Sequence, residues 1–332
     1  MESVYIDRRD TALEVSGSAL IVRHPDEPRA LSLPLQNLQR VVLASRVTLS
    51  TTVLQACSRA GVALVVLNTR APDVCTVTLP WTHGHAARRV AQYRMLGEAS
   101  SLLDASRNLV RFKIAGQRRT LLRLLRNHPD ARRAVTRSYE RLSAADDAAN
   151  SASDVASLRG IEGAAARAHF AALSHCVPAS LQFTGRNRRP PRDPVNAALS
   201  LTYTMLHGEA VRALCVAGLD PALGFYHGLS YGRESLACDL VEAFRPRADY
   251  WVVRLFNRQV LRIDHFAFGH ERSVDGACLL SKAGREQFYA AWELAAAPWR
   301  RGMRHIAITW AQQVLRDHEE GAFDDRPDNI GD

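Results

Sequence analysis

Short apolar stretches separated by turn-forming residues run through the first 80 residues of the chain. Stretches such as 19–23, 40–43 and 62–67 have the length and the Val, Ile and Leu content of strands. Gly17 and the segment 25–28 (PDEP) lie between stretches, as expected for turns. Further strands are expected at 4–6, 12–15, 30–35, 47–49 and 74–79, with one helix at 50–60. The pattern predicts a small β domain with one helix.

From residue 88 onward the apolar positions instead recur at steps of three and four, which is the period of an amphipathic helix. Pro246 is expected to stop the helix before it, because a proline inside a helix removes a hydrogen bond and clashes with the preceding turn. Residues 144–154 are expected to form a polar link. The expected helices cover 88–107, 109–126, 131–142, 194–217, 236–244, 248–262, 281–296 and 299–316.

The two patterns together predict an α+β protein. A small β-sandwich-like N-terminal domain is expected at residues 1–80, followed by a linker at 81–87 and a larger all-α domain at 88–318. Residues 319–332 are acidic and contain glycine and proline, which is typical of a disordered tail. At 332 residues the chain is long enough for both domains to have hydrophobic cores.

The chain has a formal net charge of +9, and its basic residues are almost all arginines. Lysine appears only at Lys113 and Lys282. Guanidinium groups bind phosphate oxygens in pairs, so this composition favours a nucleic acid as the partner. Arginine-rich usage can also reflect genome composition, and both explanations contribute because the arginines are clustered.

One expected helix and one loop carry most of the clustered arginines. Nearly every charge on the helix 109–126 is positive, which favours a phosphate-facing surface over an ordinary solvated face. The loop 184–193 contains prolines that forbid a helix, and its arginines lie where the next helix begins, as in a phosphate clamp. The residues expected to bind nucleic acid are Arg118, Arg119 and Arg123 on the helix, and Arg186, Arg188, Arg189 and Arg192 on the loop.

Candidate catalytic residues gather in the segment 224–246. His227 ends an apolar run, and Asp239 and Glu242 lie three apart on the expected helix 236–244, so their carboxylates share one face. Apolar neighbours indicate that this helix is at least half buried. Carboxylates among core residues are costly unless they are paired or bind a metal. One imidazole and two carboxylates therefore suggest a divalent-cation site.

A further carboxylate, Glu162, lies between two glycines and beside a run of alanines. Small residues allow another helix or backbone to approach closely. A carboxylate in such a place is either paired with Arg159 or Arg167, or it is a metal ligand. The residues alone leave both possibilities open.

Other residues with functional side chains carry weaker signals. His169 is expected to pack or face solvent, His207 has no acidic residue at ligand spacing in the sequence, and His83 and His85 are expected to be an exposed pair in the linker. Tyr203 is expected to be a core aromatic residue that could approach DNA. None of these residues is expected to bind a metal.

The cysteines and the chain termini bear on the compartment. The six cysteines are scattered and form no Cys-x-x-Cys pair, so neither a zinc site nor a disulfide framework is expected. The N-terminal residues lack the basic and apolar regions of a signal peptide, and no apolar run is long enough to span a membrane. These features predict a cytoplasmic protein.

Three separated motifs, taken in order, resemble a known family. They are residues 160–167 (GIEGAAAR), residues 187–200 (NRRPPRDPVNAALS) followed by Tyr203, and residues 224–227 (GFYH) followed by the acidic segment 233–245. With these motifs the chain resembles the CRISPR-associated adaptation endonucleases, the "Cas-one" integrase family, over nearly its whole length. Three motifs in the right order are specific, whereas a lone glutamate or histidine motif would not be.

The resemblance implies an active site in which Glu162, His227 and Glu242 hold Mg²⁺ or Mn²⁺, with Asp239 in a supporting catalytic role. It implies attack by a DNA 3′-hydroxyl on a phosphodiester, which joins short DNA duplexes into a repeat array during spacer acquisition. It also implies a homodimer formed through the β domain, double-stranded DNA as spacer precursor and repeat array, and a small partner protein that bridges two dimers.

Two other functions fit the same residues. One is a stand-alone metal-dependent nuclease that cuts branched or structured nucleic acid, since water in place of a 3′-hydroxyl turns strand joining into cleavage. The other is an arginine-rich nucleic-acid-binding scaffold with a degenerate site. Helices and a β domain alone would not distinguish these functions.

Overall fold

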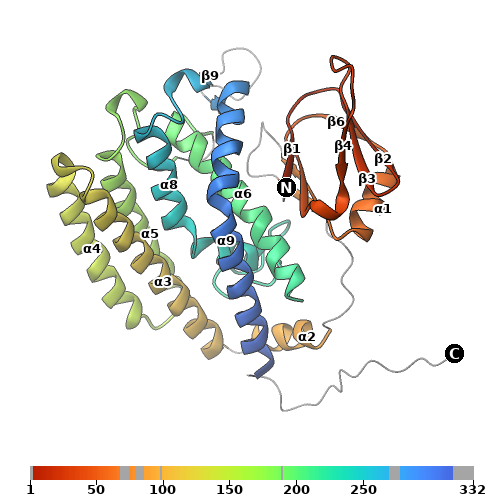
Figure 1. The fold of residues 1–332 in the computed structure, drawn as a ribbon. Coiled ribbons are helices and arrows are strands. Elements are labelled where there is room, and N and C mark those ends of the chain that lie inside the picture. Colours follow the sequence, from red (N-terminus) through yellow and green to blue (C-terminus); the bar gives the residue numbers. More distant parts are fainter. Residues whose placement is uncertain are drawn as a thin grey trace.

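The computed structural model describes residues 3–67, 75–78, 86–97, 99–187, 190–268 and 277–316. Strands dominate its N-terminal part and helices the rest, as Figure 1 shows, which confirms the expected α+β class. The expected linker pair His83 and His85, and the acidic segment 319–332, lie outside the described residues. No helix in the described ranges is long and apolar enough to cross a membrane.

Two four-stranded sheets form the N-terminal part. The first has the order β1-β5-β7-β8, in which β8 alone runs antiparallel to its neighbour; the second has the order β4-β3-β2-β6. The strands of the first sheet are β1 (Ser3–Ile6), β5 (Arg40–Leu43), β7 (Ala63–Leu67) and β8 (Cys75–Thr78). Those of the second are β2 (Thr11–Ser16), β3 (Ala19–Arg23), β4 (Leu31–Pro34) and β6 (Val47–Leu49), and helix α1 (Thr51–Arg59) follows β6.

The first sheet is covered on both faces, which explains why β5 is an unbroken apolar run after its first residue. Val41 and Leu43 belong to the core shared with the second sheet, whereas Val42 packs in the core of the helical part. Alternate residues of a strand point to opposite faces, so Arg40 lies on the same face as Val42, toward the helices. The β part is thereby joined to the helical part by a packed interface.

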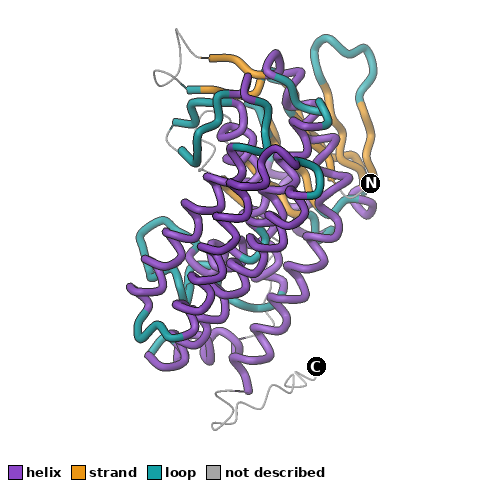
Figure 2. The backbone as a smooth tube through the Cα atoms, turned by 90° about the vertical axis from the view of Figure 1, so that its left-hand side faces the viewer, coloured by secondary structure: helices purple, strands orange, loops and turns teal. Residues whose placement is uncertain are grey.

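Eight helices from α2 to α9 are found in the described residues of the C-terminal part. Helices α3, α4 and α5 lie side by side on the side remote from the sheets, and α6 and α9 lie between them and the strands (Figure 1). Figure 2 shows the long helices running roughly along one direction. The bounds are α2 (Ala86–Met95), α3 (Ala99–Leu125), α4 (Arg132–Asn150), α5 (Val155–Ser174), α6 (Pro194–Val216), α7 (Ser235–Glu242), α8 (Arg245–Asn257) and α9 (Lys282–Arg316). A small ribbon pairs β9 (Phe266–Phe268) with β10 (Cys278–Leu280).

Two helices extend beyond the bounds expected from the sequence. The expected break at 107–109 is absent, and α3 runs from Ala99 to Leu125, after a turn at Gly97. The expected polar link is helical as far as Asn150, since its alanines are strong helix formers. Asp154 then caps α5 by accepting a hydrogen bond from the Ser157 N–H.

The helix expected at 236–244 does end before Pro246, at Glu242, whereas the expected break between the helices 281–296 and 299–316 is absent. Pro298 lies inside the continuous helix α9, where Trp292 and Trp299 pack into one aromatic cluster with Trp251 and hold the helix through the proline. Pro246 lies in the first turn of α8, where its missing N–H costs nothing. The break expected before residue 299 was wrong because tertiary packing holds α9 together through Pro298.

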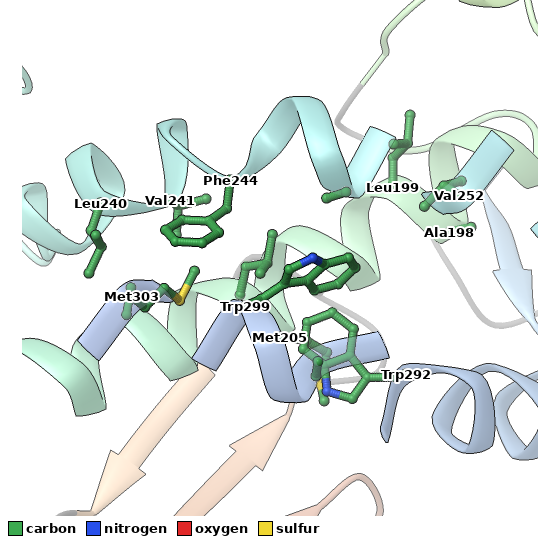
Figure 3. Close-up of a cluster of buried hydrophobic side chains, with 14 of the residues drawn as sticks. Ala198, Leu199, Met205, Leu240, Val241, Phe244, Val252, Trp292, Trp299 and Met303 are labelled. Atoms are coloured by element: carbon green, nitrogen blue, oxygen red, sulfur yellow. The ribbon is translucent and has the colours of Figure 1, made fainter. Parts of the chain in front are cut away.

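The short helix α7 packs its apolar side against the hydrophobic core. Leu240, Val241 and Phe244 point toward α9, where Met303 and Trp299 lie (Figure 3). Seven of the eight residues of α7 are buried, including Asp239 and Glu242. The two acids therefore lie on a helix that is packed against the core.

Candidate active site

A lysine on α3 joins carboxylates from two other helices. The Lys113 ammonium donates a hydrogen bond to Oε1 of Glu162 on α5 and lies 2.5 Å from Oε2 of Glu242 on α7. Lys113 falls on the buried stripe of α3, beside Ile114, so its charge is carried into the interior. The ion-pair partner of Glu162 is therefore Lys113, and not Arg159 or Arg167, which were the partners considered from the sequence.

Glu242 is held from a second side by Arg245. The Arg245 Nε lies 3.1 Å from Oε1 of Glu242, and both side chains are largely buried. Burial alone would raise the pKa of Glu242, but the charges of Arg245 and Lys113 outweigh it and lower the pKa to about 2. The Glu242 carboxylate is therefore ionised at all physiological pH values.

Asp239 holds the segment that carries His227 and does not point at the glutamates. Its Oδ2 accepts hydrogen bonds from the backbone N–H groups of Phe225 and Tyr226, at 2.9 and 3.1 Å. Its Oδ1 accepts from the His227 N–H at 3.0 Å and from His227 Nδ1 at 2.6 Å. Burial nevertheless raises the pKa of Asp239, against the lowering effect of these hydrogen bonds.

The His227 segment approaches α7 closely enough to need a glycine. A Cβ atom at Gly224 would lie 2.7 Å from the His227 carbonyl oxygen and 2.7 Å from the carbonyl carbon of Ser235. The Ser235 hydroxyl donates a hydrogen bond to the Gly228 carbonyl oxygen. These contacts fix the backbone on both sides of His227.

The hydrogen bond to Asp239 determines which nitrogen of His227 is available. Because Nδ1–H donates to the carboxylate, Nε2 carries the lone pair that can bind a metal or accept a proton. The His227 side chain is 26% exposed and that of Glu162 is 22% exposed, whereas Asp239 is fully buried. The opening to solvent lies at His227 and Glu162.

The donor atoms at this site suit a divalent cation, but an ammonium now occupies their meeting point. Among the described residues no group of three or more His, Cys, Asp and Glu side chains is arranged to hold an ion as it stands. The reason is that Lys113 lies between the carboxylates of Glu162 and Glu242. A positive charge is therefore already favoured at this point, and carboxylate and imidazole ligands fit Mn²⁺ or Mg²⁺ once Lys113 moves aside.

The loop arginines divide by orientation. Arg186 turns inward: it donates to Asn196 Oδ1 at 2.8 Å and Ser200 Oγ at 3.1 Å, and it lies over the ring of Tyr203. Arg192 is exposed, and Arg188 and Arg189 lie outside the described residues. Of the described arginines on this loop, Arg192 is the one whose side chain faces solvent.

The arginines of α3 divide in the same way. Arg118 is tied to α4 through Tyr139 and Asp146, with a hydrogen bond of 3.1 Å to the Tyr139 hydroxyl. Arg119 and Arg123 are exposed and lie four residues apart, on one face of the helix. The helix is therefore a packed element with an exposed basic edge, and only part of its positive charge is available to a phosphate backbone.

Two histidines have acidic partners that the sequence interpretation did not identify. His207 Nε2 lies 3.2 Å from Oε2 of Glu234, and His169 Nε2 lies 3.0 Å from Oδ2 of Asp249. Burial lowers the pKa of His207, but hydrogen bonds to Cys238 and Glu234 outweigh it and raise the pKa to about 9. His169 is packed, as expected, and both acidic partners escaped the sequence interpretation because they lie 27 and 80 residues away along the chain.

Lys113 and Arg245 are the site residues that the sequence reasoning left without a role in the site. One signal could have found Lys113: it is a lysine in a chain whose other basic residues are almost all arginines, and it falls on an apolar stripe. Arg245 follows Glu242 by three residues, the spacing of an ion pair on one helical face.

The comparisons with known proteins concern the family and the fold. The family model "CRISPR associated protein Cas1" matches residues 4–294. A "CRISPR-associated endonuclease Cas1 1" from Thermodesulfovibrio yellowstonii is 36% identical over 320 residues, covering 96% of this chain and 99% of that protein. Among solved structures, a casposase bound to integration product has a TM-score of 0.82 at 17% identity, covering 98% of this chain and 96% of that one.

A chain of a Cas6-RT-Cas1–Cas2 complex also has a TM-score of 0.82, at 20% identity, and covers 96% of this chain and 35% of that one. These two structures show the same fold. The family match and the relative of equal length confirm the resemblance seen in the three motifs. The protein therefore belongs to the Cas1 family of CRISPR-associated endonucleases.

Proposed function

We propose that Glu162, Glu242 and His227 form the active site with which this protein joins short DNA duplexes into a CRISPR repeat array. The observation that carries the proposal is the convergence of two carboxylates on one cationic atom beside a histidine with a free Nε2. Glu162, Glu242 and His227 Nε2 would hold Mg²⁺ or Mn²⁺, which supplies polarisation of a phosphodiester and acidification of the attacking hydroxyl.

The chain's own residues prepare this site. Asp239 orients His227 and fixes its tautomer, since it accepts hydrogen bonds from both the ring and the backbone of that residue. Arg245 and Lys113 keep Glu242 ionised in a buried place. Asp239 thus supports the site without being a ligand, because both of its oxygens are already used.

Exposed arginines are proposed to bind the DNA backbone. Arg119 and Arg123 on α3 and Arg192 on the loop face solvent, and phosphate contacts of this kind give affinity with little base specificity. Arg188 and Arg189 belong to the same proposal. Arg118 and Arg186 are proposed to act by shaping the surface, because their guanidinium groups already contact Tyr139 and Ser200.

The assembly is also a proposal. The N-terminal β part, residues 1–80, is proposed to form the homodimer, and residues 88–318 to form the catalytic domain. One chain of a Cas6-RT-Cas1–Cas2 complex shares the fold of this chain. This likeness supports a small partner protein that bridges two dimers.

The strand-joining proposal is tested with a half-site integration assay on a plasmid that contains repeats. His227→Ala is expected to abolish joining while DNA binding stays at the wild-type level. The exposed His175 provides the matched control, and His175→Ala is expected to join DNA normally. Unchanged joining by His227→Ala would contradict the site assignment.

The same assay separates the rival functions. A stand-alone nuclease would cut branched or structured DNA but never join it, even when the partner protein is added. A scaffold would bind without cutting or joining. Binding by any of the three should weaken steeply as salt rises, because it rests on phosphate contacts.

A further inference from the structure

Another buried carboxylate, that of Asp249 on α8, contacts residues of two further helices. Its Oδ1 accepts a hydrogen bond from the Tyr203 hydroxyl on α6, and its Oδ2 is 3.0 Å from Nε2 of His169 on α5. His169 is fully buried and Asp249 is 2% exposed. Three helices are therefore tied together at one carboxylate that the proposed chemistry does not use.

Two of these helices also carry the proposed metal ligands or their partners. His169 follows Glu162 by seven residues on α5, which is about two turns or 10 Å along the same face. Asp249 follows Arg245 by four residues on α8, which places the two on one face, about 6 Å apart along the helix. The contact between His169 and Asp249 thus links α5 directly to α8.

Tyr203 adds a second link between Asp249 and Arg245. The Arg245 guanidinium carbon lies 4.6 Å from the centre of the Tyr203 ring, within the range of a cation–π contact. Its Nε in turn lies 3.1 Å from Glu242. A continuous path of contacts therefore runs from His169 through Asp249, Tyr203 and Arg245 to Glu242.

We propose that His169, Asp249 and Tyr203 are positioning residues that fix the separation of the Glu162 and Glu242 carboxylates. The inference rests on the proposed function, because it concerns the same two ligands. A divalent cation requires its ligands at a fixed distance, whereas the flexible Lys113 ammonium tolerates variation. We call the contacts among His169, Asp249 and Tyr203 the brace. Loss of the brace therefore weakens cation binding more than it destabilises the fold around Lys113.

The test uses the full-length protein and Mn²⁺ alone, with bound Mn²⁺ measured from the loss of the free-ion signal in electron paramagnetic resonance. His169→Phe removes the hydrogen bond to Asp249 at similar volume and is expected to weaken Mn²⁺ binding about 10-fold, as for other residues that orient metal ligands. His169→Gln keeps a donor and should recover most of the affinity. Glu293→Gln, in a partly buried ion pair with Arg300 elsewhere in the protein, is the control and should bind as the wild type.

Tyr203→Phe is a second and gentler variant, because it removes one oxygen and keeps the ring beneath Arg245. It keeps the proposal testable even where His169→Phe fails to fold, and it should weaken Mn²⁺ binding in the same direction. Wild-type affinity in both Tyr203→Phe and a folded His169→Phe would overturn the brace. If Glu242→Ala also binds Mn²⁺ like the wild type, the proposed metal site is wrong, and the proposed brace is wrong with it. If Glu242→Ala loses Mn²⁺ binding while the His169 and Tyr203 variants keep it, only the proposed brace is wrong.

Discussion

Two buried charge clusters in this protein have opposite arrangements. In the site cluster (Lys113, Glu162, His227 and Glu242) one ammonium lies between two carboxylates. In the junction cluster (Arg40, Glu209 and Arg300) one carboxylate lies between two guanidiniums, where β5 meets α6 and α9. A site with carboxylates around one small cation can accept a metal in its place, whereas a carboxylate enclosed by arginines cannot.

Exposure separates the clusters as well. All three side chains of the junction cluster are at most 8% exposed, and burial with the charges of Arg300 and Arg212 lowers the pKa of Arg40 to about 9. The site cluster opens to solvent at Glu162 and His227. The comparison teaches that buried ion pairs alone do not mark an active site: the sign at the centre and an opening to solvent do.

The largest expected effect follows from breaking the junction cluster. Glu209→Ala leaves Arg40 and Arg300 buried without their shared carboxylate, which is expected to lower the free energy of unfolding by about 3–5 kcal/mol. Urea unfolding followed by circular dichroism measures this loss. DNA cleavage by the molecules that remain folded should be unchanged, and a selective loss of cleavage would mean that the junction cluster also serves the site.

The next largest effect is expected when a carboxylate of the site cluster is removed. Glu162→Ala is expected to slow DNA cleavage by about 10²–10³-fold, the scale of removing a group that stabilises charge in the transition state. Its free energy of unfolding should fall by only about 1 kcal/mol, because Lys113 keeps Glu242 as a partner and Glu162 is partly exposed. Wild-type cleavage rates in this variant would remove Glu162 from the site.

A smaller effect is expected when the cation at the centre of the site cluster is removed. Lys113→Met leaves two carboxylates facing each other, so Mn²⁺ should raise the melting temperature by about 2–4 °C more than it raises that of the wild type. The exposed Lys282 gives the control, Lys282→Met, which should respond to Mn²⁺ like the wild type. A smaller Mn²⁺ response in Lys113→Met would show that Lys113 does not stand in the place of the metal.

The smallest effect concerns a charge pair of intermediate exposure, His207 with Glu234. The pKa of His207 is raised to about 9 in the folded protein, above its ordinary value of 6.5. Its contribution to stability is therefore complete below pH 6.5 and is lost as the pH rises through about 9. We expect a loss of about 1 kcal/mol, since Glu234 is half exposed and solvent screens the pair. Unfolding of His207→Gln over the same pH range should lack this change.

Much of the architecture could be predicted from apolar spacing alone. The change from short apolar runs to helical spacing near residue 88 separates the sheets from the helices, because each pattern matches one period. The errors fall where distant contacts override local signals. Pro298 stays within α9 because tryptophans on both sides of it pack into one core.

The candidate site was less predictable for the same reason. His227 and Glu242 stood out by residue type and spacing, but the partner of Glu162 is Lys113, 49 residues earlier on another helix. Asp239 and Glu242 share a helix yet serve different neighbours, since Asp239 turns to the backbone before His227. Spacing on a helix gives the face of a side chain but not the partner that another helix brings to it.

The central claim is that the site cluster, and not the junction cluster, binds the catalytic ion. Crystals soaked in Mn²⁺ and measured at the manganese absorption edge test this claim most directly. The account predicts an anomalous peak between the carboxylates of Glu162 and Glu242 and beside His227 Nε2, with the Lys113 ammonium displaced. A peak elsewhere with Lys113 still bridging the two glutamates would contradict it.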